Sequence, residues 1–170
     1  MHYLYTGAMA TQWLTTEQQR DWRSLLLGST LLMDRLDRDL REHHDLSLPE
    51  YEILVRLSES GDRALRMAEL ADSVKNSRSR ITHTIARMER AGLVVRKQCP
   101  SDGRGVIAHL TERGFAKLVD AAPDHVDSVR SALIDVVAAE DLSAIGRAFS
   151  TVAEALETGE PDPVLSPKSA

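Results

Sequence analysis

The chain has a single cysteine, Cys99, so no disulfide can form within it, and neither a disulfide scaffold nor a multi-cysteine zinc site is expected. No apolar run approaches the roughly 18 residues that a membrane span needs. The N-terminus lacks a basic start followed by an apolar stretch, so it does not predict an export signal. We therefore expect a soluble, cytoplasmic protein without a membrane partner.

Catalytic motifs are also missing. The sequence has no Gly-x-Ser-x-Gly elbow, no phosphate-binding loop and no HExxH zinc motif. Gly103-x-Gly105 is too short to indicate a nucleotide fold. His43 and His44 are adjacent, and adjacent residues of a helix do not face the same way. We predict no enzyme, no cofactor and no metal site.

Charge is unevenly distributed along the chain. Residues 75–104 hold eight basic residues against the acids Glu89 and Asp102, a net charge of +6, whereas the rest carries −11 and the whole chain −5. This asymmetry indicates a surface that faces a polyanion on an otherwise acidic body. The alternative is a basic face that is merely solvated, and charge alone does not separate the two.

The 170 residues, 42% of them apolar, suffice for one domain with a core. Residues 1–14 lack periodicity and are expected to be flexible. A helix is predicted from Thr15 or Thr16 to about His44, with a glutamine three residues after the cap closing a capping box. Its apolar stripe is longer than one small domain needs, which favours packing against a second chain.

A second helix is predicted to begin after Ser47. Ser47 can cap it, Glu50 can reach back to the cap, and Pro49 sits in the first turn, where its missing N–H is harmless. Gly61 is expected to end this helix in the left-handed conformation.

Two short helices follow, over residues 67–74 and 78–91, with Ser77 as the cap of the second and Gly92 as its end. This is the layout of a helix-turn-helix. The period then changes to two over residues 94–98 and 106–110, which predicts a β-hairpin, or wing.

Thr111 is expected to cap a further helix, which Pro123 should kink or divide. A last helix carries an apolar stripe from Leu142 to Leu156. The proline-containing tail, residues 159–170, is predicted to be disordered. The fold class is thus mainly α with a small β-hairpin wing: a winged helix-turn-helix with additional long helices.

The helix from Arg78 to Ala91 has a buried and an outward face. Ile81, Ile85 and Met88 define the first. The outward face carries Ser79, Arg80, His83, Ala86, Arg87 and Arg90, with Thr82 at its edge. Such a helix fits the major groove of DNA.

The wing offers a second contact. Arg104 near its tip could enter the minor groove or neutralise a phosphate, and Asp102 could either orient an arginine or simply form the turn. Replacing Arg87 or Arg104 with alanine should weaken DNA binding and lower its salt dependence.

Five segments match a known pattern in the right order: Arg66-Met67-Ala68-Glu69-Leu70-Ala71, Ser77-Arg78-Ser79-x-Ile81-Thr82, Arg87-x-Glu89-x-Ala91-Gly92-Leu93-Val94, Cys99-Pro100-x-Asp102-x-Arg104-Gly105 and Leu110-Thr111-x-x-Gly114. These segments resemble the MarR family of bacterial transcriptional regulators. Three positions depart from that pattern: Asn76 replaces an apolar residue, and His83 and Gly103 stand where arginine is common.

The resemblance implies a homodimer that binds a pseudo-palindromic operator, usually a repressor released by a small, often aromatic, ligand. Residues 15–46 and 111–158 would form the helical dimerisation region, and residues 47–110 the DNA-binding lobe. The DNA-binding residues would be Ser77, Arg78, Ser79, Arg80, Thr82, His83, Arg87, Asp102 and Arg104.

The same resemblance places a ligand pocket where the first, second and fifth helices meet. The candidate lining residues are Trp22, Leu32, Arg35, Leu36, His43, His44, Tyr51, Leu54, Phe115 and Leu118. An aromatic acid would need a cation and a hydroxyl among apolar walls, and Arg35, a histidine and Tyr51 could supply them. Each of these residues could equally cap a helix or fill the core.

Two alternatives remain open. Cys99 follows Arg96 and Lys97, whose charges could favour a thiolate and thus oxidation sensing, although a bystander thiol explains it as well. The chain could also be a winged-helix module that binds an acidic protein rather than specific DNA.

Overall fold

A computed structural model describes residues 12–75, 77–99 and 102–158. The predictions for residues 1–11 and for the tail 159–170 lie outside the described residues. In chain order the elements are α1 (Thr16–His44), α2 (Leu48–Glu59), β1 (Ala64–Arg66), α3 (Met67–Ser73), α4 (Arg78–Arg90), β2 (Val94–Cys99), β3 (Asp102–Leu110), α5 (Glu112–Val129), the π-helical turn η1 (Arg130–Ile134) and α6 (Ala139–Thr158).

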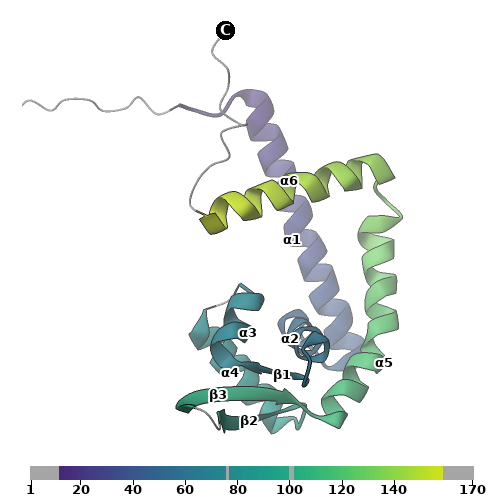
Figure 1. The fold of residues 1–170 in the computed structure, drawn as a ribbon. Helices are drawn as coiled ribbons and strands as arrows, with labels where there is room; N and C mark the ends of the chain where they lie inside the picture. The colour runs from purple at the N-terminus through teal and green to yellow at the C-terminus, as the bar shows by residue number, and fades with distance from the viewer. Residues whose placement is uncertain (1–11, 76, 100–101, 159–170) are drawn as a thin grey trace, which may run out of the picture.

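The arrangement has two parts (Figure 1). α2, α3 and α4 pack with the small sheet into a compact lobe, and α1, α5 and α6 extend away from it. The predicted fold class, mainly helical with a hairpin wing, is confirmed. No helix among the described residues is long and apolar enough to cross a membrane.

The predicted helix starts are confirmed in atomic detail. Thr15 Oγ1 accepts the N–H of Gln18, and Gln18 Oε1 accepts the N–H of Thr15, so the capping box of α1 is closed. At the start of α4, Ser77 Oγ accepts the N–H of Arg80, and at the start of α5, Thr111 Oγ1 accepts the N–H of Gly114. α1 has 29 residues and is therefore about 43 Å long.

The prediction for Gly61 is wrong. α2 ends at Glu59, and its cap residue Ser60 is extended, with φ −78° and ψ 148°. The positive φ comes later, at Arg63 (φ 50°). Ser60 explains the difference, because its hydroxyl accepts the N–H of Ala64 and its carbonyl accepts the N–H of Arg63, which turns the chain directly into β1.

The sheet has three antiparallel strands in the order β1-β3-β2. The hairpin β2-β3 was predicted; β1 was not, because three residues are too few to show an alternating pattern. β1 pairs with β3 through Leu65 opposite Ala108, and β2 pairs with β3 through Arg96 opposite the same residue. The wing is therefore anchored to the lobe along its central strand.

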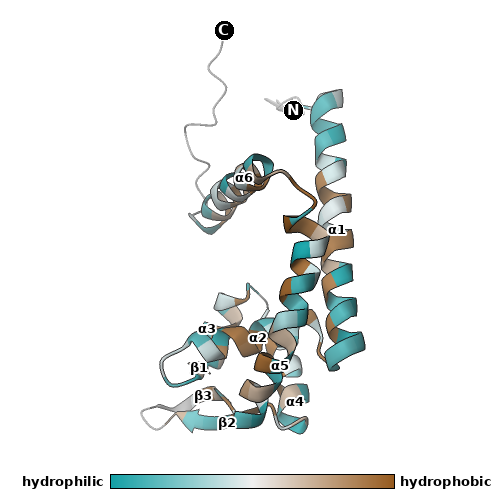
Figure 2. Ribbon diagram, turned by 90° about the vertical axis from the view of Figure 1, so that its right-hand side faces the viewer, coloured by the Kyte–Doolittle hydropathy of each residue, from teal (hydrophilic) through white to brown (hydrophobic). Residues whose placement is uncertain are grey.

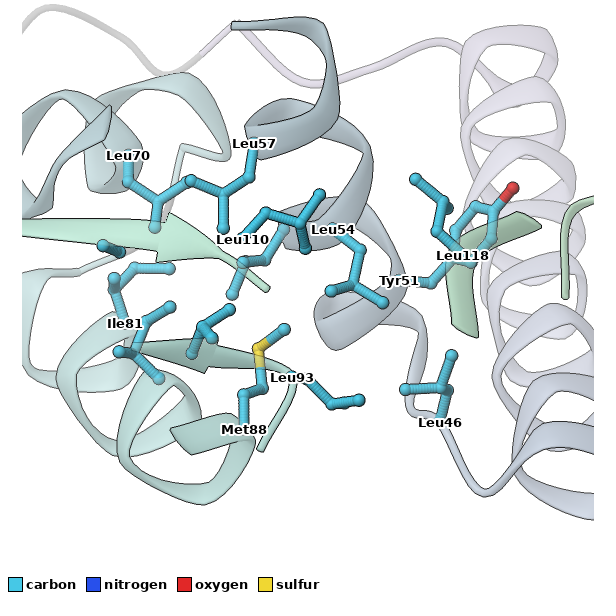
Figure 3. Close-up of a cluster of buried hydrophobic side chains, with 14 of the residues drawn as sticks. Leu46, Tyr51, Leu54, Leu57, Leu70, Ile81, Met88, Leu93, Leu110 and Leu118 are labelled. Atoms are coloured by element: carbon cyan, nitrogen blue, oxygen red, sulfur yellow. The ribbon is translucent and has the colours of Figure 1, made fainter. Parts of the chain in front are cut away.

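One core holds the lobe together and extends to the long helices. Figure 3 shows it running from Leu70 and Ile81 in the lobe to Tyr51 and Leu118 beside the long helices. Leu54, Leu57, Leu70, Ile85 and Met88 are fully buried. Because α2 contributes to both ends of this core, it joins the lobe to the long helices.

Pro123 does not divide α5, contrary to one form of the prediction. The helix runs unbroken from Glu112 to Val129. Proline removes the N–H that would bond to the carbonyl of Val119. Val119 and Pro123 are both exposed, so water can hydrate that carbonyl and the helix continues.

Large apolar side chains remain exposed on the long helices. On α1 these include Leu27 and Leu31, at 62% and 59% exposure, and on α6 they include Phe149 and Val152, at 48% and 52%. Figure 2 shows α6 standing apart from α1, and within the described chain α6 has only sparse contacts with other elements. α1 and α6 thus present apolar surface that the described residues of this chain do not cover.

Candidate nucleic-acid interface

Helix α4 presents a polar face outward because its other face is fixed in the core. Ile81, Ile85 and Met88 are buried, and Gly92, which was predicted to end this helix, lies just after it with φ +72°, in the left-handed region. The exposed residues on the outward side are Ser77, Ser79, Arg80, Thr82, His83, Arg87 and Arg90, while Ala86 is half-buried. Apart from Arg78, whose side chain the structure does not describe, the predicted contact residues of α4 are therefore accessible.

Arg87 differs from its neighbours because its guanidinium has protein partners. Its Nε lies 2.6 Å from Glu50 Oε1, and its Nη2 donates to Ser47 Oγ at 3.0 Å. Glu50 and Ser47 belong to the N-terminal turn of α2, where Glu50 Oε2 also accepts the N–H of Ser47. The sequence indicated the capping role of Glu50 but not its pairing with an arginine 37 residues away.

A second arginine of the basic segment is also paired. Arg96 on β2 donates from Nη2 to Glu89 Oε2 at 2.6 Å, and its backbone N–H donates to Glu89 Oε1 at 2.9 Å. The hydrogen bond from the Arg96 side chain, together with that from its N–H, lowers the pKa of Glu89. These contacts fasten the C-terminal end of α4 to the wing.

The wing extends beside α4. Its strands pair from Val94 opposite Leu110 to Cys99 opposite Asp102, with an irregularity between Gln98 and Cys99. The predictions for Asn76, and those for the side chains of Arg78, Asp102, Gly103 and Arg104, lie outside what the structure describes. They stay predictions.

A hollow of about 380 Å³ lies where the wing meets the helix-turn-helix. It is lined by Arg66, Met67, Ala68, Thr82, Arg96, Gly105 and Val106. Thr82 on α4 therefore faces the wing. Arg66 brings an additional positive charge here, which the sequence indicated only as part of a family motif.

Cys99 is buried at the end of β2, opposite Asp102 and away from the base of the wing, where it was expected. Arg66 donates from Nη2 to the Cys99 sulfur at 3.2 Å. The thiol thus contacts a cation, Arg66, that precedes it by 33 residues.

The structure brings together two of the predicted pocket residues. Leu36 and Tyr51 line a hollow of about 480 Å³ between the long helices and the lobe. Its other lining residues, which were not predicted from the sequence, are Met33, Leu48, Glu52, Val55, Arg56, Ser73, Val74, Lys75 and His125. Burial raises the pKa of Tyr51 and of Glu52. The lining also includes two cations: Arg56, which lies 3.6 Å from Glu59, and Lys75, which lies 2.8 Å from Glu157 on α6.

Other predicted pocket residues have different surroundings. Arg35 pairs with Asp39 on its own helix at 2.7 Å. Trp22 is half-exposed on α1, and the guanidinium of Arg63 lies 3.8 Å from the centre of the Phe115 ring. His43 lines a separate polar hollow together with Arg35.

Two histidines are enclosed by the long helices. His44 is buried, and its ring nitrogens contact carboxylates of α5, namely Asp120 and Asp124. The His125 ring lies 4.3 Å from that of Tyr51, and burial lowers the pKa of His125. His125 also lines the 480 Å³ hollow, although its Nδ1 is buried without a partner among the described residues.

An exposed polar helix on an apolar base, flanked by a hairpin, defines a winged helix-turn-helix protein. The family model described as MarR family matches residues 46–106. Among solved structures, the chain is similar to Sco3205 of Streptomyces coelicolor, a MarR family transcriptional regulator in complex with DNA, with 45% identity, a TM-score of 0.84, and coverage of 86% of this chain and 91% of that one. It is also similar to AbsC of the same organism, a MarR family transcriptional regulator, with 44% identity, a TM-score of 0.82, and coverage of 87% and 99%.

A curated relative is the HTH-type transcriptional regulator MhqR of Bacillus subtilis, 28% identical over 119 residues, which are 66% of this chain and 80% of that protein. The chain belongs to the MarR family. The proteins of this family are DNA-binding transcriptional regulators and not enzymes, as the sequence motifs predicted.

Proposed function

We propose that this protein is a cytoplasmic, homodimeric regulator of transcription that binds a specific DNA operator and represses by occlusion. The observation that carries the proposal is the outward face of α4, with Arg80 and His83 exposed above a fully buried base. The DNA complex of Sco3205, at 45% identity, supports it. Ser77, Arg78, Ser79, Thr82, Asp102 and Arg104 are proposed contacts beside these two, whereas Arg87 is already paired with Glu50.

The exposed apolar surface supports the dimer. Soluble monomers rarely expose contiguous apolar patches of this kind. Leu27 and Leu31 on α1, with Phe149 and Val152 on α6, would be covered by the same helices of a second copy. We assign residues 15–46 and 111–158 to this dimerisation region and residues 47–110 to the DNA-binding lobe.

The hollow beside Tyr51 supports release by a small ligand. Apolar walls from Met33, Leu36 and Val55 suit an aromatic ring, and Arg56 and Lys75 suit its carboxylate. The hollow lies between the long helices and the lobe, so a bound ligand would change the orientation of the lobe relative to the long helices. Benzoate, as a simple aromatic carboxylate, should release operator DNA from the wild type, and less so from Arg56→Gln.

A gel-shift assay tests DNA binding. The protein should bind the intergenic DNA upstream of its own gene more tightly than random DNA. Arg80→Gln should weaken binding and reduce the salt slope by about one, because one phosphate is no longer neutralised. Arg20→Gln on α1, an exposed arginine remote from α4, is the matched control and should bind as the wild type does.

The same assay can overturn the proposal. Absence of binding to any DNA at low salt would favour the alternative module that binds an acidic protein. Equal affinity for upstream and random DNA would contradict sequence-specific recognition.

A further inference from the structure

The N-terminus of α2 lies between α1 and α4 and is hydrogen-bonded to both. On the α1 side, Asp37 Oδ1 accepts the N–H of Leu48 at 2.8 Å, and Asp37 Oδ2 accepts Arg41 Nε at 2.6 Å. On the α4 side, Glu50 Oε1 accepts Arg87 Nε at 2.6 Å. A chain of hydrogen bonds therefore runs from α1, one of the long helices, to α4, the exposed helix.

The buried carboxylate of Glu50 is kept ionised by its hydrogen-bond donors. Its side chain is 9% exposed, whereas that of Arg87 is 51% exposed. Burial raises the pKa of Glu50, but the N–H and hydroxyl of Ser47 and the guanidinium of Arg87 outweigh burial, and the net pKa is lowered. At neutral pH the carboxylate is thus ionised and holds Arg87 against α2.

The contact uses the shape of arginine and not only its charge. Nε binds Glu50 while Nη2 binds Ser47 Oγ, and the hydroxyl of Ser47 in turn donates to Glu50 Oε2 at 2.7 Å. The three side chains form a closed ring. Lysine has a single flexible ammonium and cannot bridge both partners in this way.

We propose that Glu50 and Arg87 are positioning residues: their ion pair fixes the orientation of α4 relative to α1, and Arg87 contributes to operator recognition through Glu50 rather than by binding a phosphate. The inference rests on the proposed function, because it concerns how the same helix reads DNA. It also removes one of the arginines of α4 from the set of predicted DNA contacts.

Orientation of α4 matters more for a specific site than for random DNA. A specific complex needs both recognition helices of a dimer seated in register with base edges, whereas non-specific binding depends on charge near phosphates. Loosening the Glu50–Arg87 pair should therefore lower operator affinity and leave the affinity for random DNA unchanged. Removal of a phosphate-binding cation would lower both.

The test compares operator and random DNA over a range of salt concentrations. Glu50→Gln and Arg87→Lys should each lower operator affinity by about tenfold, as expected for losing a hydrogen bond to a charged group. Neither should change the salt slope or the affinity for random DNA. The double variant should lose little more than either single one, because both remove the same interaction.

Two controls isolate the effect. Glu59→Gln, in the last turn of α2, removes an exposed carboxylate 3.6 Å from Arg56 and should bind the operator as the wild type does. Arg80→Lys keeps the charge at a proposed phosphate contact and should retain the salt slope. If Glu50→Gln fails to fold, Arg87→Lys, which keeps the surface charge, still tests the proposal.

The outcomes separate this inference from the proposed function. A wild type that binds no DNA would overturn the proposed function. A wild type that binds specifically, with Arg87→Gln lowering the salt slope by about one and affecting both DNAs equally, would show that Arg87 is a phosphate contact and overturn only the positioning role. Unchanged operator affinity in Glu50→Gln and Arg87→Lys would overturn it as well.

Discussion

His44 Nε2 lies 2.8 Å from Asp124 Oδ2, which joins the end of α1 to α5 across 80 residues of sequence. The other ring nitrogen, Nδ1, lies 3.3 Å from Asp120 Oδ2. His44 is buried, while both carboxylates are largely exposed. The imidazole therefore fastens two long helices at the point where the chain turns toward the winged lobe.

Replacing His44 with alanine should destabilise the fold. The change removes two side-chain hydrogen bonds and leaves a gap between α1 and α5, and we expect a loss of about 1–3 kcal/mol in the free energy of unfolding. His43→Ala, at the exposed neighbouring position, should change it by less than about 0.5 kcal/mol. Urea unfolding monitored by circular dichroism measures both, and equal effects would contradict the role of His44.

Gly114 is required by a close approach of two segments. A Cβ at this position would lie 2.1 Å from the carbonyl oxygen of Leu93 and 2.8 Å from Leu110 Cδ1. The backbone must move to make room for this Cβ. Gly114→Ala should therefore lower the free energy of unfolding by several kcal/mol, which is about the whole stability of a small domain.

Gly146→Ala on α6 is the matched control. Nothing lies within 4 Å of its Cβ position, and alanine is favoured over glycine in a helix by about 1 kcal/mol, so this variant should be as stable as the wild type or more so. Thermal melting compares the two. A Gly114→Ala protein that melts with the wild type would contradict the close packing of the α5 start against Leu93.

Acid should weaken the protein partly through Glu50. Its folded-state pKa lies below the ordinary value of 4.5, so the unfolded chain binds more protons as the pH falls. The stabilisation is fully present above about pH 4.5 and is lost as the pH drops through the folded pKa. Asp37 and Glu89, whose pKa values are also lowered, contribute in the same acid range.

Glu50→Gln should therefore flatten the fall in the free energy of unfolding between about pH 5 and pH 3. Glu59→Gln, a similar change at an exposed position, should retain the wild-type slope. Urea unfolding across this range measures the slope, and an unchanged slope in Glu50→Gln would mean that the ion pair with Arg87 does not stabilise the fold.

The proposed dimer can be tested on α6. Phe149→Glu places a charge in the apolar stripe and should convert the dimer to monomers at micromolar concentration. Ser143→Glu introduces the same side chain on the opposite face of the helix and should leave the dimer intact. Light scattering after size exclusion gives the mass, and a wild-type monomer would contradict the dimerisation region.

Local signals in the sequence predicted the elements well, because caps and periodicity act over a few residues. Thr15, Ser47, Ser77 and Thr111 each begin a helix where expected. The pairing of Glu50 with Arg87 could not be predicted in this way, since it depends on how α2 and α4 cross. The strand β1 was missed for the same reason: its three residues become a strand only through pairing with β3.

In the candidate site, too, local features could be predicted from the sequence, and contacts between distant segments could not. The outward face of α4 could be derived from helical spacing, whereas the hollow beside Tyr51 depends on side chains from four separate segments. The sequence alone therefore indicated which residues of α4 point outward, but not which of its arginines forms an ion pair within the protein. Arg80 and Arg87 lie seven residues apart on the same helix, and among the described residues only Arg87 is paired with a buried carboxylate.

Selection of genomic fragments by the purified full-length protein, followed by footprinting, tests the central claim most directly. We predict enrichment of fragments that share a pseudo-palindrome, with two protected half-sites about one turn of DNA, or about 10 base pairs, apart on one face of the duplex. Enrichment no greater than that of random fragments, or protection of a single half-site by one copy of the chain, would contradict a dimer that reads DNA through its paired α4 helices.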